Sequence, residues 1–256
     1  MQHNIADGHV KTETHHGITT ITFFHPQSNS LPGKLLAELA REIHFAGTHD
    51  ETRVIVLKSD GDKAFCAGAS FDELLSIKNE EEGLQFFSGF ANVINAMRTC
   101  KKFIIARVHG RCVGGGVGLA SAADYAIAIN KADIKLSELA VGIGPFVVGP
   151  AVERKIGLSA FSALAIDATS WRPAEWAKRK GLFAEVHETI EGLDEAVDRL
   201  AETLAHSNPA AMANLKANFW DGTSHWDKLL HERAAISGKL ILSDFSKNAI
   251  QKFKMK

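Results

Sequence analysis

The sequence carries almost no net charge. Its 29 lysines and arginines are balanced by 30 aspartates and glutamates, which leaves a formal charge of -1 at pH 7. Proteins that hold nucleic acid by electrostatics need an excess or a cluster of positive charge. Because the basic residues of this chain are scattered, we predict that it has no nucleic-acid partner.

Cysteine is also scarce. The chain has three cysteines, Cys66, Cys100 and Cys112, which show no metal-ligand spacing and cannot all pair with one another. Secreted domains of few residues depend on dense disulfides, whereas free thiols are typical of reducing compartments. We therefore expect free thiols, no bound metal and a cytoplasmic location. Cys66 and Cys112 are expected to act as small buried hydrophobes.

Long apolar runs are absent as well. The first seventeen residues, MQHNIADGHVKTETHHG, lack the apolar core of a secretory signal, and no run in the chain is long enough to span a bilayer. The chain also shows no internal repeat and no low-complexity tract. We expect no membrane partner.

The chain does contain an alternating pattern of strands and helices. With 256 residues, 45% of them hydrophobic, it can bury a core as one large domain or as a domain with an appendage. A change from mixed α/β to all-helical patterning near residue 190 predicts an α/β core over residues 1–190 and a C-terminal helical region over 191–256. Strands are predicted at 18–24, 53–58, 103–108, 124–130 and 183–187, with helices from Pro32, within 71–100, within 151–181 and from 193 onward. Gly222 and Gly238 are expected to interrupt the last helical region.

The most informative segment is ARVHGRCVGGGVGLASAAD, residues 106–124. The pattern predicts a strand, then a glycine-rich turn, then a helix. Gly114, Gly115 and Gly116 permit backbone angles and close approaches that a side chain would block. Their N–H groups lie at a helix start, which favours a phosphate or a developing oxyanion. Asp124, at the end of the segment, is expected to hydrogen-bond backbone rather than substrate.

A second small-residue turn occurs earlier, in KAFCAGASFDEL at residues 63–74. It also follows a strand and precedes a helix. Taken alone, each turn is an ordinary loop of an α/β protein. Together the two turns supply the parts of an oxyanion hole, in which each aimed donor contributes on the order of 3–4 kcal/mol to transition-state stabilisation.

Three segments together resemble a known family. FCAGASFDEL, VHGRCVGGGVGLASAAD and LSELAVGIGP are similar, in order and spacing, to the enoyl-CoA hydratase/isomerase (crotonase) superfamily. The resemblance runs from about Gly17 to the C-terminus. It implies an α/β fold, a crotonase-like spiral of ββα units with a C-terminal helical trimerisation region, and trimers that commonly pair into hexamers. It also implies acyl-CoA thioester substrates and no separate cofactor, because coenzyme A is part of the substrate.

The resemblance implies specific site residues. The two oxyanion donors correspond to the backbone N–H groups of Ala69 and Gly115. Near the C-terminus, Phe253 and Lys254 resemble an aromatic–lysine pair that contacts the adenine and phosphates of coenzyme A, although a frayed basic tail is an equally good interpretation. The remaining residues expected along the coenzyme A arm are Ala67, Gly68, Ser70 and Gly114.

The acids of the site depart from the hydratase pattern. Hydratases of the family place one glutamate two residues after the glycine triplet and a second one later in the chain. The first position here is Gly118, whereas the second is Glu138. An isolated glutamate after a strand is usually a cap or an ion-pair partner, but its register within the family favours a catalytic role. A single acid beside an oxyanion hole predicts a proton shuttle, and burial is expected to raise the pKa of this acid.

The expected acyl pocket includes Gly118, Pro145 and Phe146. Phe146 and Val148 stand where many hydratases have small residues similar to glycine. Their larger apolar side chains are expected to narrow the pocket and to exclude water from it. Our first hypothesis is therefore an enoyl-CoA isomerase that moves a double bond from position 3 to position 2. The alternatives are hydration of an enoyl-CoA (including a branched one), another thioester reaction such as decarboxylation or C–C cleavage, and a non-catalytic acyl-CoA-binding protein.

The C-terminal helices carry apolar faces that suit either a subunit interface or the core of the chain. The sequence does not distinguish these two roles. The residues concerned are Phe219, Trp220, Trp226, Leu229, Leu230, Leu240 and Ile241.

Overall fold

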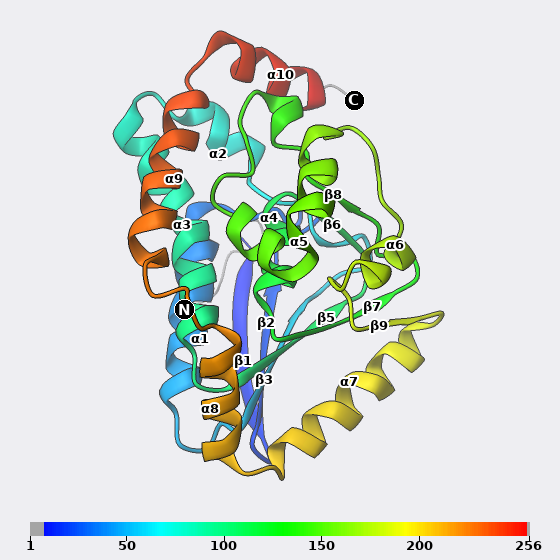
Figure 1. Cartoon of the computed structure of the whole chain (residues 1–256). Helices are drawn as coiled ribbons and strands as arrows, with labels where there is room; N and C mark the ends of the chain where they lie inside the picture. The colour runs from blue at the N-terminus through cyan, green and yellow to red at the C-terminus, as the bar shows by residue number, and fades with distance from the viewer. Residues whose placement is uncertain (1–7, 255–256) are drawn as a thin grey trace.

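A computed structural model describes residues 8–254 of the chain (Figure 1). These residues form a six-stranded sheet in the order β1-β2-β3-β5-β7-β9 and a three-stranded sheet in the order β4-β6-β8. Only β1 and β2 pair antiparallel, and the other pairs are parallel. The strands are β1 (His9–His15), β2 (Ile18–Phe24), β3 (Val54–Ser59), β4 (Ala64–Cys66), β5 (Phe103–Val108), β6 (Arg111–Val113), β7 (Tyr125–Ile129), β8 (Ile134–Lys135) and β9 (Glu185–His187).

The predicted α/β class with ββα units is confirmed. A strand of the large sheet is followed by a strand of the small sheet and then by a helix, in the series β3-β4-α2, β5-β6-α4 and β7-β8-α5. The repeat is thus one of topology and not of sequence. The helical elements are α1 (Gly33–Thr48), α2 (Phe71–Ser76), α3 (Glu80–Thr99), α4 (Gly115–Ala122), η2 (Leu139–Val141), α5 (Gly149–Ile166), α6 (Ala174–Arg179), α7 (Ile190–Ala205), α8 (Pro209–Phe219), α9 (Trp226–Leu240) and α10 (Asp244–Lys254).

The helices cover the sheets from several sides (Figure 1). α7 packs against β3, β5 and β7, whereas α1 packs against β1, β2 and α3. α9 lies along α3, and α10 packs against α2 and η2. The helices after residue 190 therefore contact the α/β part of the same chain, and the predicted division at that residue stays a prediction.

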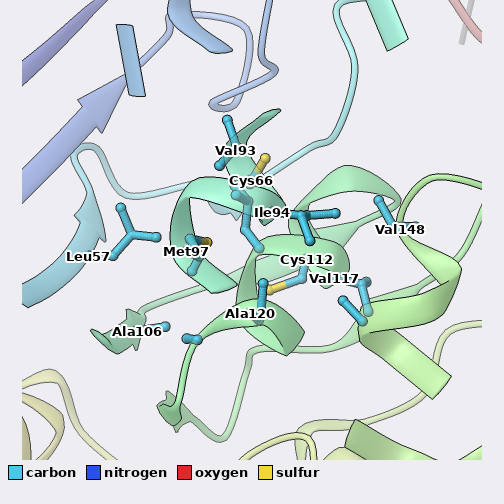
Figure 2. Packing of buried hydrophobic residues seen from close by; sticks show 14 of the residues in the cluster. Leu57, Cys66, Val93, Ile94, Met97, Ala106, Cys112, Val117, Ala120 and Val148 are labelled. Atoms are coloured by element: carbon cyan, nitrogen blue, oxygen red, sulfur yellow. The ribbon is translucent and has the colours of Figure 1, made fainter. Parts of the chain in front are cut away.

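A buried core surrounds α4. Every residue of this helix is buried, and Figure 2 shows Val117 and Ala120 among Ile94 and Met97 of α3. Close packing of this kind leaves a helix little freedom to shift. The glycine-rich N-terminus of α4 is therefore held in a fixed position.

The cysteines lie where the sequence indicated. Cys66, Cys100 and Cys112 are free and buried, and burial raises the pKa of the Cys66 thiol to about 12. A thiol with such a pKa is a poor nucleophile. Cys66 and Cys112 pair across β4 and β6 and fill the core between the two small strands.

The structure differs from the sequence interpretation at two places, a strand that was not predicted and a glycine whose expected role was wrong. The polar segment 9–15 forms β1, because its alternating side chains pair with β2 in full register. Gly238 was expected to interrupt the C-terminal helices, yet it lies inside α9. A Cβ at Gly238 would lie 2.6 Å from the backbone nitrogen of Leu84. This glycine therefore allows the backbones of α3 and α9 to approach closely where the helices cross, and it does not end a helix.

The apolar residues of the C-terminal helices differ in burial, and Trp220 and Leu229 are partly buried against the core. Trp226, Leu230 and Ile241 are at most 6% exposed and belong to the core of the chain. Phe219 and Leu240 are 50% and 37% exposed. The predicted trimer or hexamer stays a prediction.

No helix in the stretch from residue 8 to residue 254 has the length and apolar character needed to cross a membrane. Within the same residues, no group of histidine, cysteine, aspartate and glutamate side chains has an arrangement suited to a metal ion.

Candidate active site

The two glycine turns predicted from the sequence lie against each other. Gly68 has a φ of +87°, and a Cβ at this position would lie 2.9 Å from the carbonyl oxygen of Val113 and 3.5 Å from the nitrogen of Gly115. A Cβ at Gly116 would lie 2.4 Å from the carbonyl oxygen of Cys66. Glycine is therefore required at both positions, because the loop after β4 and the turn before α4 are in backbone contact.

Each turn presents an unused donor. Leu31 N–H donates to Gly68 O at 2.7 Å, and Ser70 N–H donates to Leu31 O at 3.3 Å. Successive N–H groups of an extended chain point to opposite sides, so the N–H of Ala69 points away from Leu31. Gly115 is the first residue of α4, where N–H groups lack partners within the helix. Neither N–H donates to a main-chain carbonyl within the described part of the chain.

Glu138 lies beside these donors. It immediately precedes η2, and its carbonyl oxygen accepts a hydrogen bond from Ile143 N–H at 3.0 Å. Its Oε1 lies 3.1 Å from the position that a Cβ of Gly114 would occupy. The carboxyl group is therefore packed directly against the glycine turn.

The carboxyl group of Glu138 is in an apolar environment. Among the described residues, its Oε2 is buried and has no hydrogen-bond partner. Removal from water disfavours the charged form, and burial raises the pKa of Glu138 from 4.5 to about 7. An acid with this pKa can both accept and donate a proton near neutral pH. A simple capping or ion-pairing role does not agree with these surroundings.

The raised pKa predicts a dependence of stability on pH. The folded state binds the Glu138 proton more tightly than the unfolded state, so the stability that it contributes is present at low pH and is lost as the pH rises from about 4.5 through about 7. Glu138→Gln stays uncharged at every pH. We expect this variant to be more stable than the wild type at pH 8, by about 3 kcal/mol.

Urea unfolding of both proteins from pH 5 to pH 8 measures this difference. The gap is expected to shrink as the pH falls towards 5. Equal stability of the two proteins at pH 8 would show that Glu138 does not lose solvation on folding.

The donors and the acid share one narrow cavity of about 60 Å³. Its walls come from the loop after β4, the N-terminal turn of α4, the loops on either side of η2, and one face of α3. Eight of the predicted site residues line it: Ala67, Gly68, Ala69, Gly114, Gly115, Glu138, Pro145 and Phe146.

Of the other three predicted residues, two do not line the cavity and the side chain of the third is not described. Ser70 caps α2, where its Oγ accepts a hydrogen bond from Glu73 N–H at 3.4 Å. Gly118 is covered by Val148, because a Cβ at Gly118 would lie 2.6 Å from Val148 Cγ1. Lys254 is the last residue of α10, and its side chain lies outside the described residues. The ring of Phe253 packs edge-on against Phe71 at a centroid distance of 6.4 Å.

The structure adds residues that the sequence interpretation missed. Phe87 and Phe90 of α3 line the cavity, and a Cβ at Gly115 would lie 2.2 Å from Phe90 Cε1. Their spacing on a helix is the pattern of any core-facing residue, so it carried no functional signal. Ser237 lines the cavity from α9 and had no local signal at all.

Asp124 has the predicted backbone role, and its Oδ1 also accepts a hydrogen bond from Trp220 Nε1 at 3.2 Å. Its Oδ2 accepts a hydrogen bond from Ile104 N–H at 2.8 Å. The same oxygen forms an ion pair with Lys216 Nζ of α8 at 2.8 Å. This pair ties the C-terminal helices to the end of α4 and the start of β5.

Comparison with known proteins shows which family the chain resembles over most of its length. The sequence profile of the family described as "Enoyl-CoA hydratase/isomerase" matches residues 13–256. The chain is 28% identical over 194 residues to a (7aS)-7a-methyl-1,5-dioxo-2,3,5,6,7,7a-hexahydro-1H-indene-carboxyl-CoA hydrolase of Mycobacterium tuberculosis, covering 74% of each chain. It is 27% identical over 204 residues to the peroxisomal Delta(3,5)-Delta(2,4)-dienoyl-CoA isomerase of Arabidopsis thaliana, covering 74% of this chain and 72% of the relative.

Solved structures agree on the fold. The crystal structure of an enoyl-CoA hydratase from Bacillus halodurans matches with a TM-score of 0.87, covering 95% of this chain and 99% of that chain. At 22% identity this similarity establishes the fold alone. The named relatives carry out different reactions, so the reaction of this chain has to be argued from its own site.

Proposed function

The chain belongs to the enoyl-CoA hydratase/isomerase family, and from this premise we propose that it moves the double bond of a 3-enoyl-CoA to position 2, with Glu138 as the single proton carrier. The observation that carries the proposal is the contact of Gly118 with Val148. The cavity has one buried carboxyl group, and the place of a second one is filled by an apolar side chain.

The first part of the mechanism is the binding of the thioester carbonyl. Loss of a proton from C2 of the substrate places negative charge on the thioester oxygen. The N–H groups of Ala69 and Gly115 line the same cavity and donate to no backbone carbonyl among the described residues. Two such fixed donors stabilise the developing oxyanion more than the neutral ground state, which lowers the barrier.

The second part is the movement of the proton. The Glu138 carboxylate takes the proton from C2, and the electrons of the C2–H bond form a C1=C2 double bond while the carbonyl electrons move to the thioester oxygen. When the carbonyl re-forms, the C1=C2 electrons become the new C2=C3 double bond, the electrons of the former C3=C4 double bond take the proton from Glu138 at C4, and the carboxylate is regenerated. With a pKa of about 7, the group is basic enough to accept the proton from C2 and acidic enough to donate it at C4.

The third part is the exclusion of water. Hydration needs a water molecule that is held and deprotonated while the double bond is protonated. Phe146 and Val148 line the cavity together with Phe87 and Phe90, so the space around Glu138 offers few partners for such a water. An apolar wall favours return of the proton to carbon over the addition of water.

The test uses purified protein with hex-3-enoyl-CoA and hex-2-enoyl-CoA. We expect conversion of the first into the second, followed by NMR, and no formation of 3-hydroxyhexanoyl-CoA from either. Hydration without isomerisation would contradict the proposal and favour a hydratase. No turnover of either substrate, with acyl-CoA still bound, would favour another thioester reaction or a binding protein.

The contact between Gly118 and Val148 gives a separate prediction. Gly118→Glu alone is expected to lose about 2 kcal/mol of stability, because the new side chain has no space against Val148 Cγ1. The double variant Gly118→Glu with Val148→Gly removes the clash. We expect it to recover part of the lost stability and to gain measurable hydration of hex-2-enoyl-CoA.

Urea unfolding and chromatography of the hydration product measure the two effects, with Val148→Gly alone as the control. A Gly118→Glu protein as stable as the wild type would show that Val148 does not occupy this space.

A further inference from the structure

The hydroxyl group of Ser237 has no role in the proposed reaction. Ser237 lies on α9, is 1% exposed and lines the cavity that holds Glu138. Among the residues lining that cavity, polar side chains are otherwise limited to Ser137 and Glu138, which are neighbours in the chain. Ser237 therefore places an isolated polar group on an otherwise apolar wall.

The Ser237 hydroxyl has no hydrogen-bond partner among the described residues. Hydroxyls on other helices donate to the carbonyl four residues earlier, as Thr99 does to Asn95 and Thr203 to Arg199, both at 2.8 Å. The Ser237 hydroxyl does not form this bond to the carbonyl four residues earlier. The Ser237 oxygen is not one of the fully buried polar atoms that lack a partner, so it is accessible from the cavity and can hydrogen-bond a ligand there.

The position of Ser237 is tightly fixed. Its neighbour Gly238 is pressed against α3, where a Cβ at Gly83 would lie 2.6 Å from Gly238 O. One turn earlier on α9, Arg233 Nη1 donates to the carbonyl oxygen of Phe146 at 3.5 Å. The helix is thus tied both to α3 and to the loop that closes the cavity. A polar group held in this way can distinguish between ligands.

We propose that Ser237 is a specificity-determining residue that hydrogen-bonds a neutral oxygen, a hydroxyl or a ketone, on the acyl chain of the bound thioester. The substrate class is then an oxygenated acyl-CoA and not a plain alkyl one. A carboxylate is not expected, because no lysine, arginine or histidine is among the residues that line the cavity. The inference rests on the proposed binding of an acyl-CoA thioester, but not on which reaction follows.

Binding of saturated thioesters tests the inference apart from the reaction. Hexanoyl-CoA, 5-hydroxyhexanoyl-CoA and 6-hydroxyhexanoyl-CoA are titrated calorimetrically into the wild type and into Ser237→Ala. The wild type is expected to bind one hydroxylated thioester roughly three- to tenfold more tightly than hexanoyl-CoA, the range of one neutral hydrogen bond. Ser237→Ala is expected to lose this preference and to bind hexanoyl-CoA as well as before.

Ser88→Ala is the matched control. The Ser88 hydroxyl is buried and has no partner among the described residues, but Ser88 does not line the cavity. This variant is expected to keep the wild-type preference. Equal binding of all three thioesters by the wild type, or a preference that survives in Ser237→Ala, would overturn the inference. Loss of the preference in Ser237→Ala supports it even when no isomerase activity is found, so failure of the proposed reaction is separately visible.

Discussion

Glu138→Gln is expected to lower kcat for the migration of the double bond by about a thousandfold. Glutamine keeps the size of the side chain but can neither take the proton from C2 nor return it at C4. The residue contacts the glycine turn through its carboxyl end, and the amide fits the same space. We therefore expect binding of hexanoyl-CoA to stay within about threefold of the wild type.

The pH profile of the wild type gives an independent readout. Proton abstraction needs the ionised carboxylate, and the pKa of Glu138 is about 7. We expect kcat/KM to rise tenfold per pH unit below that value and to level above it. An enzyme whose kcat/KM is flat from pH 5 to pH 8 would contradict the assignment of Glu138 as the base.

A matched control is Glu232→Gln. Glu232 is an exposed residue of α9 that pairs with Lys228 across one helical turn, so the same chemical change is expected to leave kcat unchanged. A Glu138→Gln protein that retains a tenth or more of the wild-type kcat would show that another group carries the proton.

Lys216→Ala is expected to have the largest effect on stability, a loss of about 3–5 kcal/mol. Lys216 is 1% exposed. Its Nζ lies 2.8 Å from Asp124 Oδ2 and donates to the carbonyl oxygen of Lys102 at 2.8 Å. Removal of the ammonium group leaves the buried carboxylate of Asp124 without its ion-pair partner. It also leaves a cavity where the lysine stem was packed.

Urea unfolding followed by circular dichroism measures this loss. Lys228→Ala, at a pair in which the lysine side chain is 85% exposed, is the control and is expected to change stability by less than about 0.5 kcal/mol. The double variant Lys216→Ala with Asp124→Asn removes both charges and is expected to be more stable than Lys216→Ala alone. A loss below about 1 kcal/mol in Lys216→Ala would show that water already solvates the pair.

Much of the fold followed from local patterns. The strands at 18–24 and 103–108 have the predicted bounds. Their short stretches rich in apolar and β-branched residues favour a strand and not a helix. β1 was missed because its residues are mostly polar and its strand character depends on pairing with β2. Gly238 was misinterpreted for a similar reason. A glycine that ends a helix and a glycine that lets two helices touch look alike in a sequence, and only the contact with Gly83 separates them.

The sequence by itself determined which groups meet at the centre of the candidate site. The two glycine turns, Glu138 and the missing acid at Gly118 are local features, because backbone freedom and side-chain type belong to single residues and short segments. The order and spacing of these segments were sufficient to indicate the family.

Only the tertiary structure decided the surroundings of these groups. Burial of Glu138, the filling of space at Gly118 by Val148, and the arrival of Phe90 and Ser237 from α3 and α9 all depend on segments far apart in the chain. Desolvation and packing are properties of a group's whole surroundings. The same glutamate therefore has an ordinary pKa in an unfolded chain and a pKa of about 7 in the closed cavity.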